Sequence, residues 1–240
     1  MKIIDATWEK RNLGVKTTEV VINDTDSISD VILELNKIDS EYIVVKCPTT
    51  NLNFYFDLSK MGFTFVETLI NVTHNLKNIK LDPIQKRIND SVSYQEMNEE
   101  DIEQLNKELD NGLFYTDRVY LDPYFDKKQA SNRYKLWIQD ETRKGSQLYK
   151  LVYKNQSIGF FIFKDLGEGV AYPFLAGIYK DFQKYSFGSM FIYKPIEEAV
   201  KRNCKIISTY VSSNNFNAVN SHVNMGFSVK GMQYIFVKHN

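Results

Sequence analysis

The sequence contains little cysteine and no net charge. Cys47 and Cys204 are the two cysteines among 240 residues, and neither belongs to a CxxC or cysteine–histidine cluster. We predict two buried, reduced thiols and no metal site, with a disulfide or a nucleophilic thiol as the alternative. Thirty basic residues cancel thirty acidic ones. This balance argues against a dedicated nucleic-acid-binding protein, which normally carries a basic excess.

Long apolar runs are also missing. No stretch approaches eighteen consecutive apolar residues, and the first nine residues carry charges without an apolar core. We therefore expect no membrane span, no signal peptide and a cytoplasmic protein. Hydrophobic residues nevertheless make up 43% of the chain, which is enough to fill a core.

The hydrophobic pattern predicts alternating strands and helices. Strands are expected at 42–46, 64–71, 148–153, 158–164, 170–178, 205–211 and 231–238. Helices are expected at 51–60, 96–109, 127–144, 189–202 and 215–225. The order indicates an α/β protein of mixed α+β character, with a mixed, largely antiparallel sheet flanked by helices. Residues 75–92 lose periodicity and contain Pro83, so they are predicted to be a linker. We expect a small α/β domain over residues 1–85 and a second domain over 86–240.

An internal repeat relates these two parts of the chain. Residues 43–71 and 207–235 run in step at an offset of 164. Two triplets keep this register: Asn51-Leu-Asn53 aligns with Asn215-Phe-Asn217, and Met61-Gly-Phe63 aligns with Met225-Gly-Phe227. The alternative is a common strand–helix–strand pattern repeated by chance. We favour a true repeat, in which the first domain is a truncated copy of the last part of the second.

Residues 176–190 contain a strand end, a short polar loop and a helix start near Ser189. The first backbone N–H groups of a helix have no partner within the helix, and the helix dipole favours a negative charge there. The segment therefore suits a phosphate group of a cofactor. It matches neither the dinucleotide-binding nor the P-loop fingerprint. An ordinary strand–helix turn is the alternative.

Two motifs resemble the GNAT acetyltransferase superfamily. Gln183-Lys-Tyr-Ser186-Phe-Gly188 is similar to the acyl-CoA motif Gln/Arg-x-x-Gly-x-Gly/Ala, with Ser186 in place of the middle glycine. Asn215-Phe-Asn-Ala218, followed by Gly226-Phe227, is similar to a later helix of that superfamily. The resemblance implies a GNAT domain over 86–240 and acyl-CoA-dependent N-acetyltransferase activity. It also implies acetyl-CoA as co-substrate and no metal.

A closer resemblance extends over most of the chain. Thr7-Trp-Glu9, Leu13-Gly-Val15 and Asp122-Pro-Tyr124 are similar to segments of the dTDP-fucosamine (dTDP-4-amino-4,6-dideoxygalactose) acetyltransferases. It implies transfer of an acetyl group to the amine of a nucleotide-linked amino deoxysugar, by direct attack without a covalent enzyme intermediate. The alternatives are another amine, such as a peptide N-terminus or a small amine, and an acyl-CoA-binding module without turnover. A homodimer formed by the N-terminal part is a further hypothesis.

The resemblance also implies the site residues. Those expected to bind the cofactor are Leu175, Ala176, Gly177, Ile178, Gln183, Lys184, Tyr185, Ser186, Phe187, Gly188, Ser189 and Asn215. The tyrosine that acts as general acid in the nearest relatives is replaced here by His222, whose imidazolium form could protonate a thiolate. Tyr185, Tyr210 and Tyr234 are the alternatives for this acid.

The acceptor candidates lie in one segment. Arg118 is expected to pair with a diphosphate, because its planar fork suits phosphate oxygens, or else to be a surface arginine. Tyr115, Asp117 and Tyr124 are expected to face the acceptor.

Overall fold

The computed structural model describes residues 1–77 and 79–240. Within them, the strands form one mixed sheet of ten strands in the order β1-β2-β3-β10-β4-β9-β8-β7-β6-β5. The strands are β1 (Lys2–Asp5), β2 (Thr17–Val21), β3 (Tyr42–Pro48), β4 (Thr64–His74), β5 (Val92–Glu96), β6 (Gln147–Tyr153), β7 (Gln156–Asp165), β8 (Val170–Ile178), β9 (Ile206–Ser212) and β10 (Ser228–His239). All pairs are antiparallel except β2–β3 and β8–β9. The predicted mixed α/β fold is confirmed.

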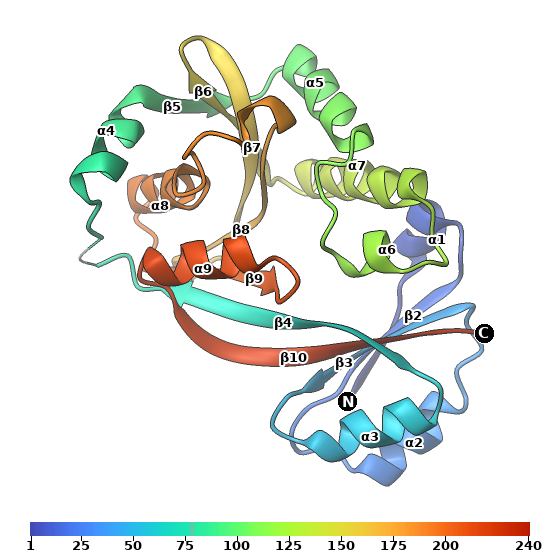
Figure 1. Cartoon of the computed structure of the whole chain (residues 1–240). Helices are drawn as coiled ribbons and strands as arrows, with labels where there is room; N and C mark the ends of the chain where they lie inside the picture. The colour runs from blue at the N-terminus through green and yellow to red at the C-terminus, as the bar shows by residue number, and fades with distance from the viewer. Residues whose placement is uncertain (78) are drawn as a thin grey trace.

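The helices pack on both faces of this sheet (Figure 1). They are α1 (Thr7–Leu13), α2 (Ile28–Leu35), α3 (Leu52–Lys60), α4 (Pro83–Ser91), α5 (Glu99–Asp110), α6 (Arg118–Leu121), α7 (Lys127–Arg143), α8 (Met190–Lys201) and α9 (Phe216–Asn224). Among the strands that follow β4, side chains from α8 fill the core on one face, and side chains from α5 and α7 fill it on the other. Different helices therefore cover the two faces of this part of the sheet.

Local sequence explains where several elements begin. Lys154 and Asn155 have φ angles of 48° and 61°, so a tight turn joins β6 to β7 as the polar loop predicts. Asp126 and Gln129 form a capping box at the start of α7. Cys47 is buried and Cys204 is half-buried, and both are free thiols.

The predicted linker is partly regular structure, so that prediction is wrong over residues 83–92. Asp82 caps α4 through a capping box, and Pro83 occupies the first turn, where a missing N–H costs nothing. Polarity on the exposed helix hid its periodicity. Asn78 of the predicted linker lies outside the described residues. The predicted domain boundary at 85/86 falls inside α4 and stays a prediction.

The repeat predicted from the sequence coincides with the elements. An offset of 164 carries β3 onto β9 and α3 onto α9, end for end, and carries the first residue of β4 onto that of β10. The two copies share the path strand–helix–strand. Their agreement in length and position extends well beyond the two triplets, which supports a duplicated unit over a chance pattern.

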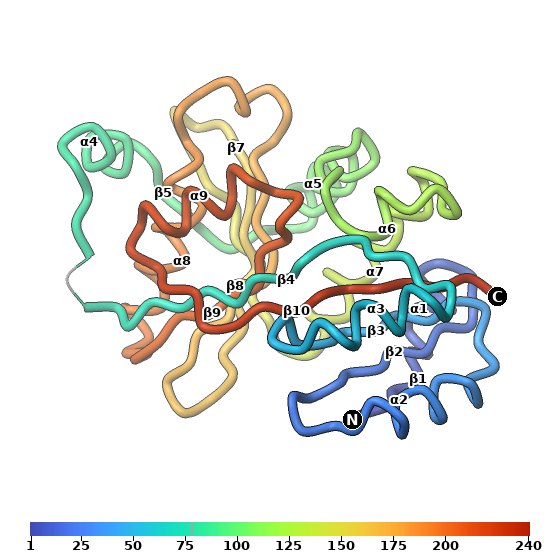
Figure 2. Tube along the Cα trace, turned by 60° about the horizontal axis from the view of Figure 1, so that its bottom comes forward, coloured from blue at the N-terminus to red at the C-terminus, as the bar shows by residue number. Residues whose placement is uncertain are grey.

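The two copies exchange their closing strands. β10 pairs with β3 on one side and with β4 on the other, while β4 also pairs with β9. Each closing strand therefore lies beside the opening strand of the other copy. Figures 1 and 2 show β4 and β10 as two long neighbouring strands that connect the two halves.

The pairing of β4 with β10 has local two-fold symmetry. The pair Thr64–Val237 corresponds to Thr73–Ser228 under the offset, and Leu69–Gln233 corresponds to itself at the centre. The ladder shifts register twice, once past Val66 and once past Lys230. These positions are equivalent in the two copies, so even the β-bulges obey the symmetry.

Candidate functional site

A gap opens between the parallel strands β8 and β9. They pair at Val170–Ile206 and Ala171–Ile207, and no pair follows within the described residues. The Thr209 hydroxyl then donates to the Pro173 carbonyl oxygen at 2.8 Å, and this is the last hydrogen bond between the two strands in the described residues. Beyond this bond, the edge of β8 that faces β9 has no strand partner. An unpaired strand edge presents N–H and C=O groups that a ligand amide can bind.

The end of β8 has a defined orientation. The Tyr179 N–H donates to the Ile158 carbonyl oxygen on the β7 side. Because backbone groups alternate along a strand, those of Ala176 and Ile178 face the gap, and those of Gly177 face β7. Two of the four predicted β8 residues thus present backbone groups to the gap.

Gly159 and Gly177 allow β7, β8 and α8 to approach closely here. A Cβ at Gly159, whose φ is 154°, would lie 2.2 Å from the Gly177 carbonyl oxygen and 2.5 Å from the Phe191 ring. A Cβ at Gly177 would lie 3.1 Å from Leu113 and Phe160 side-chain atoms. The floor of the gap is therefore tightly packed.

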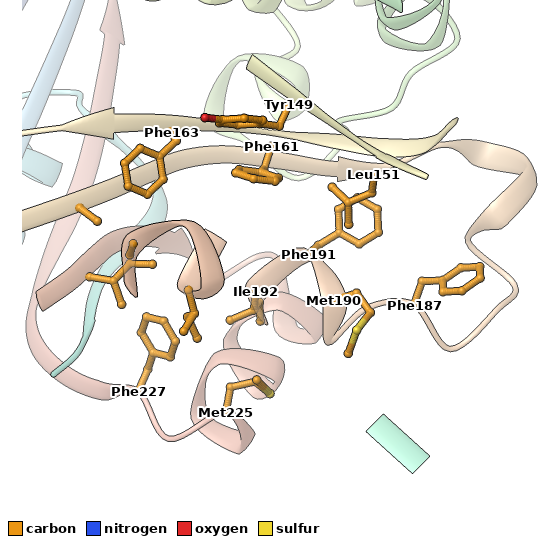
Figure 3. Close-up of a cluster of buried hydrophobic side chains, with 14 of the residues drawn as sticks. Tyr149, Leu151, Phe161, Phe163, Phe187, Met190, Phe191, Ile192, Met225 and Phe227 are labelled. Carbon is orange, nitrogen blue, oxygen red and sulfur yellow. The ribbon is translucent and has the colours of Figure 1, made fainter. Parts of the chain in front are cut away.

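A loop leads from β8 into α8. Phe187, Met190 and Phe191 are buried, and the Phe191 ring points toward the sheet beside Leu151, which fixes the start of the helix (Figure 3). In the part of the chain that the structure describes, the N–H groups of Gly188 and Ser189 pair with no carbonyl oxygen. A Cβ on Gly188 would meet no atom within 4 Å, so that space is open. These N–H groups can bind an anion.

Gln183 has a different contact from the one predicted. Its side-chain amide Nε2 donates to the Ile178 carbonyl oxygen at 3.1 Å, which ties the loop to the end of β8. Lys184, Tyr185 and Ser186 follow it on the exposed surface. Gln183 therefore shapes the loop, and its predicted contact with a pyrophosphate stays a prediction.

Asn215 caps α9. Its side-chain oxygen accepts from the Ala218 N–H at 3.1 Å. This bond explains an asparagine at this position without any ligand. The amide nitrogen of the same side chain is still available for the predicted contact with the cofactor.

His222 lies on α9 and packs edge-on against Phe227, with ring centroids 5.0 Å apart. Its Nδ1 lies 2.8 Å from the Ala218 carbonyl oxygen, which only accepts, so Nδ1 carries a proton. Burial lowers the pKa of His222, and the bond to Ala218 partly opposes this shift. The lowered pKa favours the neutral ring, in which Nε2 is an acceptor. This protonation state does not suit a general acid, whose role stays a prediction.

Solved structures resemble this fold over most of the chain at low sequence identity. One is a functionally unknown conserved protein from Staphylococcus epidermidis, with 14% identity, a TM-score of 0.65, and coverage of 97% of this chain and 88% of that one. A GCN5-related N-acetyltransferase from Sphaerobacter thermophilus has 9% identity and a TM-score of 0.63, covering 99% and 75%. A tandem GNAT protein from the clavulanic acid biosynthesis pathway has 10% identity and a TM-score of 0.57, covering 93% and 75%. The chain has the GNAT fold. No protein-family model and no curated protein matches the sequence.

In this GNAT fold, the acceptor candidates do not form one open site. Arg118 is only 9% exposed, and its Nη2 lies 3.4 Å from Glu9 Oε1 and 3.3 Å from Glu19 Oε1. Asp117 caps α6 by accepting from the Val119 N–H at 2.8 Å. The expectation of a surface arginine is therefore wrong, and a diphosphate would have to compete with two carboxylates for Arg118.

The tyrosine candidates are scattered. Tyr115 and Tyr124 are exposed, and Tyr124 stacks on His239 with ring centroids 4.0 Å apart. Tyr185 lies in the loop before α8, and Tyr210 lies half-exposed on β9. Tyr234 packs against Tyr55 in the N-terminal copy. Only Tyr185 and Tyr210 therefore lie on segments that border the gap or its loop.

Glu67 is the buried acid that the sequence analysis missed. It lies on β4, is 3% exposed, and its Oε2 has no hydrogen-bond partner among the described residues. A signal was present: in the predicted strand at 64–71, Glu67 and Leu69 share one side, so the pattern places an acid among core residues.

The cavities lie away from the loop before α8, and the described residues contain no metal site. A cavity of about 680 Å³ lies between Val66, Tyr124 and Lys238, and one of about 180 Å³ lies between Gly112, Tyr120 and Tyr134. Neither reaches the loop before α8. Over residues 1–77 and 79–240, no cluster of three metal-ligating side chains occurs, and no helix is both long and apolar enough to cross a bilayer.

Proposed function

We propose that the protein transfers an acetyl group from acetyl-CoA to a primary amine. The observation that carries this proposal is the unpaired edge of β8, which runs directly into the loop with free N–H groups at the start of α8. The edge suits the two amides of a pantetheine arm, and the loop suits a pyrophosphate. Coenzyme A carries both groups.

The reaction is proposed to be a direct attack. The neutral amine adds to the thioester carbon, the C–N bond forms, the C–S bond breaks, and the thiolate takes up a proton. Backbone N–H groups at the end of β8 are suited to stabilise the oxyanion. His222 stays a candidate for the acid that protonates the thiolate, on the condition that a bound ligand keeps its ring charged.

We propose the acceptor first as a chemical class and then as a specific compound type. A small primary amine is the class, and the amine of a nucleotide-linked amino deoxysugar is the finer proposal, which rests on the sequence resemblance alone. The ion pairs of Arg118 with Glu9 and Glu19 weaken the case for a nucleotide-linked acceptor, because Arg118 was the candidate partner of the diphosphate. A peptide N-terminus or another small amine is the alternative acceptor.

Calorimetric titration with acetyl-CoA tests the cofactor site. We expect saturable binding, and we expect Gly188→Ala to weaken it by about tenfold or more, because the added methyl group would occupy space next to the free N–H groups. Gly231→Ala is the matched control, since a Cβ at Gly231 also meets no atom within 4 Å but lies on β10. An absence of binding at millimolar acetyl-CoA would contradict the proposal.

Release of free thiol then separates enzyme from binding module. The protein is incubated with acetyl-CoA and a panel of amines that includes nucleotide-linked amino sugars and a peptide N-terminus. Free thiol that depends on one amine supports transfer and identifies the acceptor. Tight binding without thiol release would favour an acyl-CoA-binding module, a role consistent with the neutral His222 and with Ser186 in the loop.

A further inference from the structure

Glu67 is a buried acid that the cofactor site does not explain. Burial raises its pKa, while the Ser212 hydroxyl, acting as a hydrogen-bond donor, and the charge of Arg118 partly oppose this rise. Its Oε2 is buried without a hydrogen-bond partner in the described part of the chain. A buried acid of this kind is unfavourable for stability, and such acids are concentrated at functional sites.

The sheet places Glu67 and Ser212 on one face, at the end of the gap. Ile207 and Val211 of β9 pack into the core beneath α8, so Ser212 points to the opposite face. Ser212 pairs with Leu69 of β4, and Glu67 lies two residues from Leu69 with no bulge between them. The two side chains are therefore diagonal neighbours on the face away from α8 and the cofactor loop.

The Ser212 hydroxyl lies in a turn that backbone hydrogen bonds hold in place. Its Oγ accepts from the Asn214 N–H at 3.2 Å, and its side chain lies on the same face of the sheet as Glu67, whose pKa it lowers. The Ser213 Oγ accepts from the Thr68 N–H at 2.9 Å, which fixes this turn on β4. A hydroxyl has two acceptor positions, so one of them is left for a ligand N–H.

Charged side chains of both signs surround Glu67. Four carboxylates, those of Glu9, Glu19, Glu67 and Asp117, meet three cations, those of Lys46, Arg118 and Arg133. Ion pairs within 4.0 Å join Glu9 and Glu19 to these cations, whereas Glu67 and Asp117 form none among the described residues. Glu67 and Asp117 are therefore the two acids of this group that have no cation within 4.0 Å in the described residues.

We propose that Glu67 and Ser212 form a proton relay for the acceptor amine, an inference that rests on the transfer reaction proposed above. The ammonium group gives one proton to Ser212 Oγ, while the hydroxyl proton of Ser212 passes to Glu67. The neutral amine then attacks the thioester, so that the C–N bond forms and the C–S bond breaks. Its second proton goes to the CoA thiolate, and Glu67 later returns its proton to solvent.

The relay joins the two copies of the repeat. Glu67 comes from the closing strand of the N-terminal copy, and Ser212 ends the opening strand of the C-terminal copy. The acceptor class is therefore a primary ammonium that enters from the face opposite α8. Ser212 contacts the acceptor, and Glu67 acts through it as a positioning and proton-accepting residue.

The experiment compares Glu67→Gln and Ser212→Ala with the full-length protein. We expect both variants to keep their acetyl-CoA affinity and to lose about 10²–10⁴-fold in kcat for thiol release with an amine. We also expect Glu67→Gln to lose the rise in rate with pH that reports ionisation of a base. Glu198→Gln is the control, because Glu198 is equally buried but its oxygens already accept from Tyr94, Tyr149 and Arg202. It should keep kcat per folded molecule.

The outcomes separate the relay from the transfer reaction. If Glu67→Gln keeps kcat within about tenfold and the pH profile of the wild type, the relay is overturned while acetyl transfer stands. If the wild type releases no thiol with any amine, the proposal of acetyl transfer fails. The amine site of the relay is then tested by measuring the binding of n-propylamine to the full chain with saturation-transfer NMR. A signal that Glu67→Gln abolishes supports the site. No signal, or equal signals from both proteins, overturns it.

Discussion

Glu67 links a residue to the stability of the whole chain. Because its folded-state pKa is raised, the folded protein holds this proton more tightly than the unfolded chain does. Its contribution to stability is therefore most favourable below the unfolded-state pKa of 4.5 and declines as pH rises through the folded-state value. We expect Glu67→Gln to remove this decline. At pH values above the folded-state pKa, the variant should be at least as stable as the wild type, as measured by urea unfolding at a series of pH values. A variant that is less stable at every pH would contradict this.

His222 is the residue where protonation decides the mechanism. Since burial lowers its pKa below the usual 6.5, the neutral ring predominates at pH 7.5. We expect His222→Ala to reduce thiol release by less than about tenfold at that pH. A loss of about 10²–10⁴-fold would instead restore His222 as the general acid. Asn224→Ala, at the end of the same helix, is the control for helix damage.

Single residues differ in how well their environment could be predicted from sequence. The open space at Gly188 and the free N–H groups beside it follow from the local order of strand, loop and helix. The ion pairs of Arg118 do not, because Glu9 and Glu19 lie 109 and 99 positions away in the chain. Contacts that depend on long-range packing leave no local pattern, so the acceptor side is where sequence reasoning failed.

At the scale of elements, the junction of β7, β8 and α8 is the most constrained. We expect Gly159→Ala to destabilise the protein by roughly 2–4 kcal/mol, because its methyl group would overlap the Gly177 carbonyl oxygen and the Phe191 ring. Thermal unfolding measures this loss. Gly188→Ala, with open space around it, should leave the unfolding temperature nearly unchanged. Equal effects from the two substitutions would show that the packing argument is wrong.

Elements with strong periodicity were predicted well, and weakly apolar ones were not. The strands from β6 to β9 and the helix α7 match their predicted ranges within a few residues. α4 has no fully buried residue, and Ile84 and Ile88 are its only apolar side chains besides Pro83, so its apolar stripe is narrow. The order of strands in the sheet could not be predicted either, since the exchange of β4 and β10 depends on pairing between distant segments.

At the scale of the whole molecule, the exchanged strands argue against independent halves. A chain truncated to 86–240 loses β3 and β4, which are both neighbours of β10, and Val72 from the core beneath α8. We expect this truncated chain to be unfolded or aggregated by circular dichroism and size exclusion with light scattering. A folded truncated chain would contradict the expectation, and an unchanged dimer would also exclude an N-terminal dimer surface.

The position of β10 has a consequence for synthesis on the ribosome. β10 follows every other described strand in the chain, yet it lies between β3 and β4, which are made much earlier. Until it leaves the exit tunnel, β3 and β4 each expose an unpaired edge, which is a template for association with other chains. Nascent chains of this protein should therefore depend on chaperones until β10 has emerged, and a truncation that removes β10 should cause aggregation out of proportion to the few residues lost.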